Sequence, residues 1–171
     1  MKKLILISAL TFLFSSLLCN SAIAQKKYVE EMKSAAEIQA EWYERTLPEL
    51  SRKIPAHPKK TTLVQLADPS KANKLEKEEL HVLVEKRKEY LSLQTEIALN
   101  HVRTPGLGYA YAEELKQYTS KLNSLSEELY SGKITFGEYN KKRIEFANES
   151  SAKMTEAFRI YHAQALNLKL N

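Results

Sequence analysis

The sequence is poor in side chains that catalyse reactions. Its 171 residues contain one cysteine, one aspartate and four histidines. His81 and Glu85 stand four positions apart, a spacing that places both on one helical face and permits a shared metal ion. Because the surrounding stretch is rich in Glu and Lys, we expect a solvated pair there instead, and no metal site or cofactor. The other histidines have no partner spaced to make one a catalytic base: His57, His101 and His162.

Motifs of known enzyme classes are also missing from the sequence. It has no His-Glu-x-x-His, no Cys-x-x-Cys-His and no paired Glu-x-x-His, which argues against zinc proteases, c-type cytochromes and di-iron bundles. Ser126 and Ser131 lack a neighbouring His or Lys of the hydrolase kind. The segment Gly106-Leu107-Gly108 is too short for a phosphate-binding loop and follows no predicted strand. We therefore expect a protein that is not an enzyme.

The first 24 residues have the pattern of an export signal. A basic start, Met1-Lys2-Lys3, precedes an uncharged apolar run over 4–18, and Ala22 and Ala24 supply the small residues that a signal peptidase reads. The run is shorter than the roughly 20 residues that a membrane-spanning helix needs. We expect cleavage after Ala24 and a periplasmic or secreted protein. The alternatives are an uncleaved anchor and a lipoprotein acylated at Cys19.

Removal of this signal changes the charge and the cysteine count. Lys2, Lys3 and Cys19 leave with it, so 147 residues remain, with 24 basic side chains, 21 acidic ones and no cysteine. Disulfides and thiolate metal sites are thereby excluded from the mature chain. An exported protein without disulfides is more typical of a bacterial periplasm than of small eukaryotic secreted domains. The net charge of +3 is too small to indicate a nucleic-acid partner.

Four helical stretches separated by proline and glycine account for nearly all of the mature chain. Apolar residues recur in them at steps of three and four, and from Tyr111 to Leu129 the spacing is that of a coiled-coil seam. Arg87 and Gln94 occupy core-side positions of the second stretch. The expected fold class is all-α: long antiparallel helices that form a helical bundle or extended helical hairpins, in one domain over 25–171. The helices are predicted at about 27–47, 69–102, 109–131 and 136–168.

Local signals predict where these helices begin and end. Pro48 ends the first helix, and Asp68-Pro69 has the pattern of an N-cap followed by proline at the first helical position. Gly132 is expected to cap the third helix at its C-terminus. Thr135 and Glu138 stand three residues apart and predict a capping box that opens the fourth helix.

The corner between the third and fourth helices resembles a known module. Residues 119–148 contain a leucine-rich helix, the corner Gly132-Lys133-Ile134-Thr135 and the pair Glu138-Tyr139. These features are similar to the short C-terminal (SHOCT-type) helical hairpin, although Gly137 replaces a commonly acidic residue. The resemblance implies oligomerisation or partner contacts more than catalysis. Helix capping alone also accounts for the corner.

A basic loop is expected over 51–67. Pro55 and Pro58 exclude a regular helix there, and four positive charges stand close together with no negative one between them. Such a cluster can contact anionic lipid head groups or an acidic partner. An exposed loop with no partner is the alternative. The basic residues are Arg52, Lys53, Lys59 and Lys60.

Tyrosine outnumbers phenylalanine nine to three once the signal is removed. A tyrosine ring offers apolar area together with a hydroxyl, which suits interfaces. A surface for partners is therefore one interpretation, and rings that fill the bundle with hydroxyls at its rim are the other. The tyrosines near the third helix are Tyr109, Tyr111, Tyr118, Tyr130 and Tyr139.

Taken together, these patterns favour an exported, non-enzymatic helical protein of the bacterial envelope. We expect it to act by self-association or by binding other envelope proteins as an adaptor or chaperone. We expect no nucleic-acid partner and a weak membrane-surface contact through the basic loop. The alternatives are a carrier of a small ligand or metal inside a helical bundle, and a membrane-anchored lipoprotein acylated at Cys19.

Overall fold

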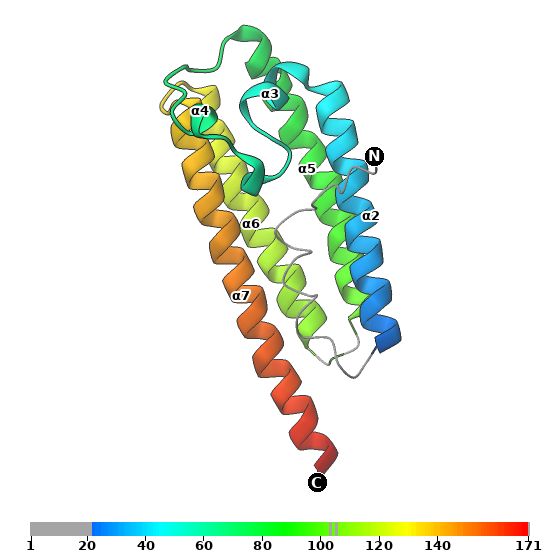
Figure 1. Cartoon of the computed structure of the whole chain (residues 1–171). Coiled ribbons are helices and arrows are strands. Elements are labelled where there is room, and N and C mark those ends of the chain that lie inside the picture. Colours follow the sequence, from blue (N-terminus) through cyan, green and yellow to red (C-terminus); the bar gives the residue numbers. More distant parts are fainter. Residues whose placement is uncertain (1–21, 103, 105, 171) are drawn as a thin grey trace, which may run out of the picture.

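The computed structural model shows four long helices that run alternately up and down (Figure 1). It describes residues 22–102, 104 and 106–170, a part of the chain that contains no strand, so the all-α prediction is confirmed. Of the expected signal peptide over 1–24, only residues 22–24 are described. Cys19 lies outside the described residues. The long helices are α2 (Ala22–Thr46), α5 (Lys74–His101), α6 (Leu107–Tyr130) and α7 (Phe136–Leu170).

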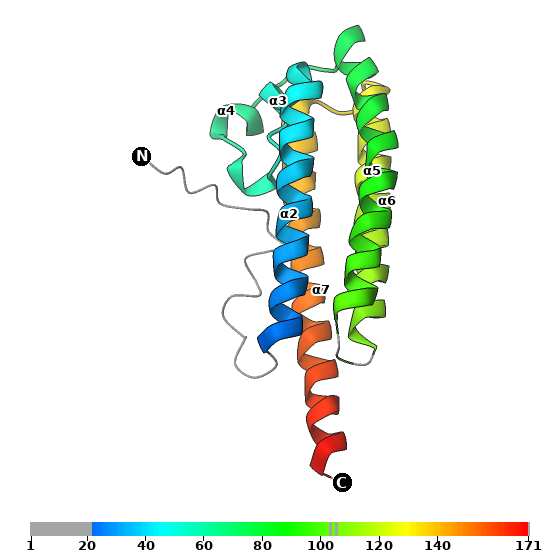
Figure 2. The same cartoon turned by 90° about the vertical axis from the view of Figure 1, so that its right-hand side faces the viewer.

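The helices form an open four-sided bundle. α2 packs on α5, α5 on α6, and α6 on α7, whereas α2 and α7 make few close backbone approaches on the fourth side (Figures 1 and 2). The segment between α2 and α5 lies across that fourth side, at the end of the bundle where α5 begins, and it contacts α7. We call this end of the bundle the Lys74 end and the opposite one the His101 end.

The basic segment is more ordered than the sequence suggested. Instead of one loop over 51–67, it contains α3 (Pro48–Lys53), the 3₁₀ turn η1 (Pro58–Lys60) and α4 (Leu63–Leu66). Pro48 and Pro58 stand at the first positions of α3 and η1. A backbone N–H at the first position of a helix has no partner within the helix, so proline, which lacks this N–H, is well suited to start these turns. The predicted loop over 51–67 is therefore divided into short helical turns, which are separated by irregular backbone at 54–57 and 61–62.

The start of α5 also differs from the prediction. The helix begins at Lys74 and not at Pro69, because Asn73 and Glu76 form a complete capping box around its first turn. Asp68 instead accepts a hydrogen bond from the Ser70 backbone N–H at 2.8 Å, which closes a local turn before the helix.

The corner between α6 and α7 agrees with the prediction. Gly132 has a φ of 72° and ends α6, and the Thr135–Glu138 capping box opens α7. Gly137 lets this corner meet the α3–α5 segment directly, because a Cβ atom there would stand 2.7 Å from the Leu66 carbonyl oxygen. The Gly137 N–H donates to the Asp68 carbonyl at 2.9 Å and so finds a partner outside the helix.

Two apolar clusters fill the two ends of the bundle. Five residues of the predicted seam of α6 are buried, and four of them are divided between the clusters, two to each. None of the described helices is long and apolar enough to cross a membrane. The Lys74-end cluster includes Tyr43, Leu47, Leu50, Leu80, Leu125, Leu129, Phe136 and Tyr139. The His101-end cluster includes Tyr28, Met32, Ile97, Ala98, Leu107, Tyr111, Leu115 and Met154.

Candidate functional site

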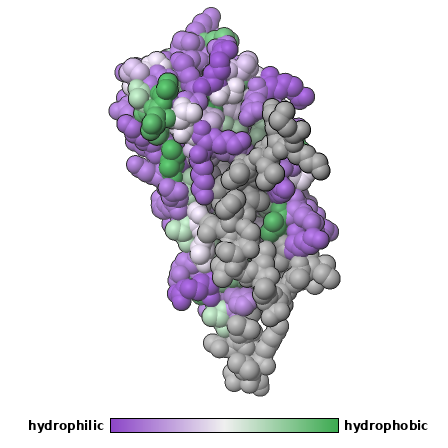
Figure 3. Space-filling view, viewed as in Figure 1, coloured by the Kyte–Doolittle hydropathy of each residue, from purple (hydrophilic) through white to green (hydrophobic). Residues whose placement is uncertain are grey.

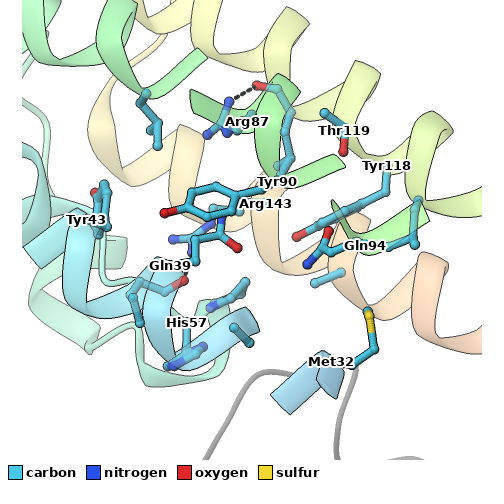
Figure 4. A pocket seen from close by; sticks show the side chains of 18 of the residues that line it. Met32, Gln39, Tyr43, His57, Arg87, Tyr90, Gln94, Tyr118, Thr119 and Arg143 are labelled. Carbon is cyan, nitrogen blue, oxygen red and sulfur yellow. Dashed lines mark hydrogen bonds between the residues drawn. The ribbon is translucent and has the colours of Figure 1, made fainter. Parts of the chain in front are cut away.

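A cavity of about 160 Å³ lies in the bundle between the two apolar clusters (Figure 4). All four long helices and the segment after α3 contribute to its wall. An engineered apolar cavity of about 150 Å³ is large enough to bind benzene. The space therefore matches a six-membered ring. Its apolar lining includes Met32, Ala36, Ile54, Leu83, Leu115 and Ala147.

Two arginines give the cavity a positive charge. Arg87 comes from α5 and Arg143 from α7, and their exposed fractions are only 9% and 7%. Among the described residues that line the cavity there is no Asp or Glu. Two buried cations thus share one space with no acidic side chain in its wall.

Arg87 is held entirely by neutral oxygen atoms. It donates to the Leu122 carbonyl at 3.1 Å, to the Ser126 hydroxyl at 2.8 Å and to the Tyr139 hydroxyl at 2.9 Å. The Asn123 side-chain oxygen lies 3.3 Å from the same guanidinium. These bonds orient the side chain, but among the described residues none of its partners carries a negative charge.

Arg143 ties α7 to the segment that follows α3. It donates to the carbonyl oxygens of Pro55 and Ala56, both at 2.7 Å. These acceptors are neutral too. Arg143 was not among the residues selected from the sequence, although its position four residues after Tyr139 and three before Phe146 places it on the apolar stripe of α7.

The two guanidinium groups change the proton affinity of their neighbours. Burial alone would raise the pKa of the Tyr139 hydroxyl, but Arg87 and Arg143, with hydrogen bonds from Ser126 and Arg87, outweigh burial and lower it. Burial raises the pKa of Tyr118, and the two arginines oppose that rise only in part. Burial, Lys60 and Arg143 lower the pKa of His57, which favours its neutral form. The local field is therefore positive.

Uncharged polar and aromatic side chains complete the wall. Gln39 from α2, Gln94 from α5 and Tyr118 from α6 gather around Tyr90 and Arg143 (Figure 4). Trp42 meets Tyr90 edge to face, with ring centroids 6.1 Å apart. The site therefore combines apolar walls, flat rings, amide groups and two cations, which suits a ligand with a ring and an anionic group.

The structure does not bring the five selected tyrosines onto one surface. Tyr111 and Tyr139 are buried in different clusters, and Tyr118 lines the cavity. Tyr109 and Tyr130 are 74% and 50% exposed, but they lie at opposite ends of α6. Tyr139 belongs to α7, so the five do not share one helix.

The four selected basic residues are divided as well. Lys53 forms an ion pair with Glu76 at 2.7 Å and stands 4.4 Å above the Phe136 ring, so it is part of the packing. Arg52 pairs with Glu49 at the surface. Lys59 and Lys60 are exposed.

The histidines do not assemble a metal site in the part of the chain that the structure describes. No group of three or more His, Cys, Asp or Glu side chains is placed there to hold an ion. His81 and Glu85 are both exposed, and Glu85 binds Lys88 at 2.8 Å. His101 lies 2.7 Å from Glu31, which links the ends of α5 and α2.

Comparisons with family models, with curated proteins and with solved structures find nothing that matches this chain. The resemblance of residues 119–148 to a SHOCT-type hairpin therefore stays a prediction.

Proposed function

We propose that the protein is a non-enzymatic carrier that binds a small organic anion with a ring in its central cavity. One observation carries this proposal: two buried guanidinium groups, Arg87 and Arg143, line an apolar cavity that has no acidic residue among its described lining. We further propose that the carrier is exported, on the strength of the signal-like pattern over residues 1–24.

The energetics of buried charge support an anionic ligand. An ion removed from water is costly unless an opposite charge or several hydrogen bonds compensate it. Neutral oxygens hold both arginines in place, and a carboxylate would add the missing opposite charge. The planar guanidinium also matches a carboxylate in shape and can hold it through two parallel hydrogen bonds.

The aromatic walls support a ring as the apolar part of the ligand. Trp42, Tyr90 and Tyr118 line the cavity, and flat rings of this kind stack on or pack edge-on against a second ring. An adaptor or chaperone would need an extended exposed surface. The tyrosines expected to form such a surface are split between the core and the two ends of α6. The cavity therefore supports a carrier better than it supports an adaptor or chaperone.

A fluorescence titration tests the proposal, because the only tryptophan, Trp42, lines the cavity. Benzoate and 4-hydroxybenzoate are the probes, with benzamide as the neutral molecule of the same shape. We expect the anions to change Trp42 emission with at least tenfold tighter binding than benzamide. Equal binding of benzoate and benzamide would refute the role of the arginines.

A substitution that adds a negative charge to the cavity wall tests whether benzoate binds inside the cavity. Gln94→Glu adds an anion beside the arginines, so we expect benzoate to bind at least tenfold more weakly while the thermal midpoint stays the same or rises. Gln117→Glu makes the same chemical change on the exposed face of α6 and serves as the control. If both variants bind benzoate like the unmodified protein, the ligand does not occupy the cavity.

Export is tested separately by the intact mass of the protein recovered from outside the cytoplasm. A mass that begins at Gln25 supports cleavage after Ala24. A mass that begins at Cys19 and includes acyl chains would replace this proposal with the lipoprotein alternative.

A further inference from the structure

The short helix α4 presents its apolar side chains to solvent. Leu63 and Val64 are 84% and 81% exposed, the highest values among the large hydrophobic residues that the structure describes. Figure 3 shows a strongly apolar patch at the Lys74 end of the molecule, where α4 lies in Figure 1, with hydrophilic surface beside it. Lys59 and Lys60 are the last two residues of η1, which precedes α4 in the chain. We call Lys59, Lys60, Leu63 and Val64 the α4 knuckle.

The orientation of α4 is imposed by its polar partners. The Gln65 side chain donates to the Arg52 carbonyl at 2.8 Å, and the Gln65 carbonyl accepts from Asn140 at 3.2 Å. The Thr62–Gln65 capping box fixes the first turn. The polar residue of α4 thus faces the protein while its first two apolar residues face outward, the reverse of an ordinary surface helix. Folding alone gives no reason for this exposure.

The charge around the knuckle is also unbalanced. Between residues 59 and 74 the chain has four lysines and a single acidic residue, Asp68. All four lysines are exposed, and none has an ion pair among the interactions of the described residues. A partner for this surface must therefore be negative and must also accept two aliphatic side chains. The lysines are Lys59, Lys60, Lys71 and Lys74.

We propose that the α4 knuckle docks the protein on an anionic lipid surface. In this arrangement Leu63 and Val64 enter the boundary between head groups and acyl chains, and Lys59 and Lys60 contact the phosphates. A stable protein partner would need about 800 Å² of complementary surface, whereas the knuckle offers only two protruding aliphatic side chains flanked by cations. A lipid surface needs no shape complementarity. The contact is weak and reversible, and it does not depend on what the cavity binds.

Vesicle sedimentation tests this docking with the unacylated protein. Vesicles of equal parts phosphatidylglycerol and phosphatidylcholine are compared with pure phosphatidylcholine at low salt and at 0.5 M salt. We expect binding to the anionic vesicles only, and we expect high salt to weaken it. Equal binding to both kinds of vesicle, or binding to neither, would overturn the proposal.

Paired variants separate the two parts of the knuckle. Lys59→Gln with Lys60→Gln is expected to weaken vesicle binding by about fivefold per lysine, and Leu63→Ser with Val64→Ser by at least tenfold. Lys33→Gln with Lys116→Gln removes two exposed lysines elsewhere and should leave binding unchanged. Ile38→Ser, at a 60% exposed position of α2, is the control for apolar area.

An acidic protein partner is the competing interpretation, and poly-glutamate serves as its probe. If poly-glutamate displaces the vesicles completely and the double serine variant binds them as the unmodified protein does, the knuckle recognises negative charge alone. That result would refute lipid docking. Retained binding that requires Leu63 and Val64 supports it.

Discussion

The ion pair between Lys53 and Glu76 offers a sharp test of how the bundle is held together. Glu76 opens α5 as the third residue of its capping box, yet it is only 2% exposed. Lys53, at the end of α3, reaches it at 2.7 Å and also donates to the Ser70 hydroxyl at 3.0 Å. Lys53→Met keeps a long apolar side chain at this position and removes the ammonium over the Phe136 ring, which is the only charge that pairs with Glu76 among the described residues.

The size of the effect follows from the burial of the two partners. Removing one member of a fully buried pair costs about 3–5 kcal/mol, because the other charge stays buried without compensation. The Lys53 side chain is 30% exposed, so water can reach the site in part, and Glu76 keeps its hydrogen bond from the Asn73 N–H. We therefore expect a loss of about 2–3 kcal/mol in the free energy of unfolding. At a urea slope of about 2 kcal/mol per M, the midpoint falls by roughly 1–1.5 M.

Urea unfolding followed by circular dichroism at 222 nm measures this loss. Glu76→Gln retains the capping box, since glutamine also serves at its third position, and Lys53→Met with Glu76→Gln is expected to recover most of the stability lost in the single variant. Arg52→Met removes the neighbouring surface pair with Glu49 and should leave the midpoint unchanged. If Lys53→Met shifts the midpoint no more than Arg52→Met does, the buried pair does not hold α3 to α5.

Two further predictions concern the segment that crosses the open side of the bundle. Because burial, Lys60 and Arg143 hold the pKa of His57 below its ordinary 6.5, the unfolded chain binds the proton more readily. Stability is therefore complete above about pH 6.5 and falls as the pH drops below it, and His57→Gln should flatten this dependence in thermal melts. Gly137→Ala should destabilise the protein by about 1–3 kcal/mol in urea, because the new Cβ meets the Leu66 and Asp68 carbonyls. A stabilising effect of this alanine, as in an ordinary helix, would mean that α7 does not contact the segment so closely.

Helices and their caps could be predicted because their signals are local. The apolar steps of three and four in α6 and the Thr135–Glu138 capping box involve residues within one or two turns of each other. The start of α5 was misplaced because two local signals compete there, and Asn73 with Glu76 forms a complete box whereas Asp68 does not. That signal is present in the sequence and could have been found.

The order of the α3–α5 segment was not predictable in the same way. Its turns are held by bonds to residues far along the chain: Arg143 binds the Pro55 and Ala56 carbonyls, and the buried Glu79 accepts from the Leu50 N–H at 2.7 Å. The segment is basic and rich in proline, so a window of sequence resembles a loop. Its order exists only once α5 and α7 stand beside it.

What the sequence by itself determined is the α class and the absence of cysteine from residues 25–171, because helix periodicity and composition do not depend on how helices meet. Only the tertiary structure decided which side chains face one another. It buried Tyr111 and Tyr139, left Tyr109 and Tyr130 at opposite ends of α6, and placed Arg143 beside Arg87. A helix face is either core or surface according to what packs against it, and a site assembled from four helices exists only after they have packed.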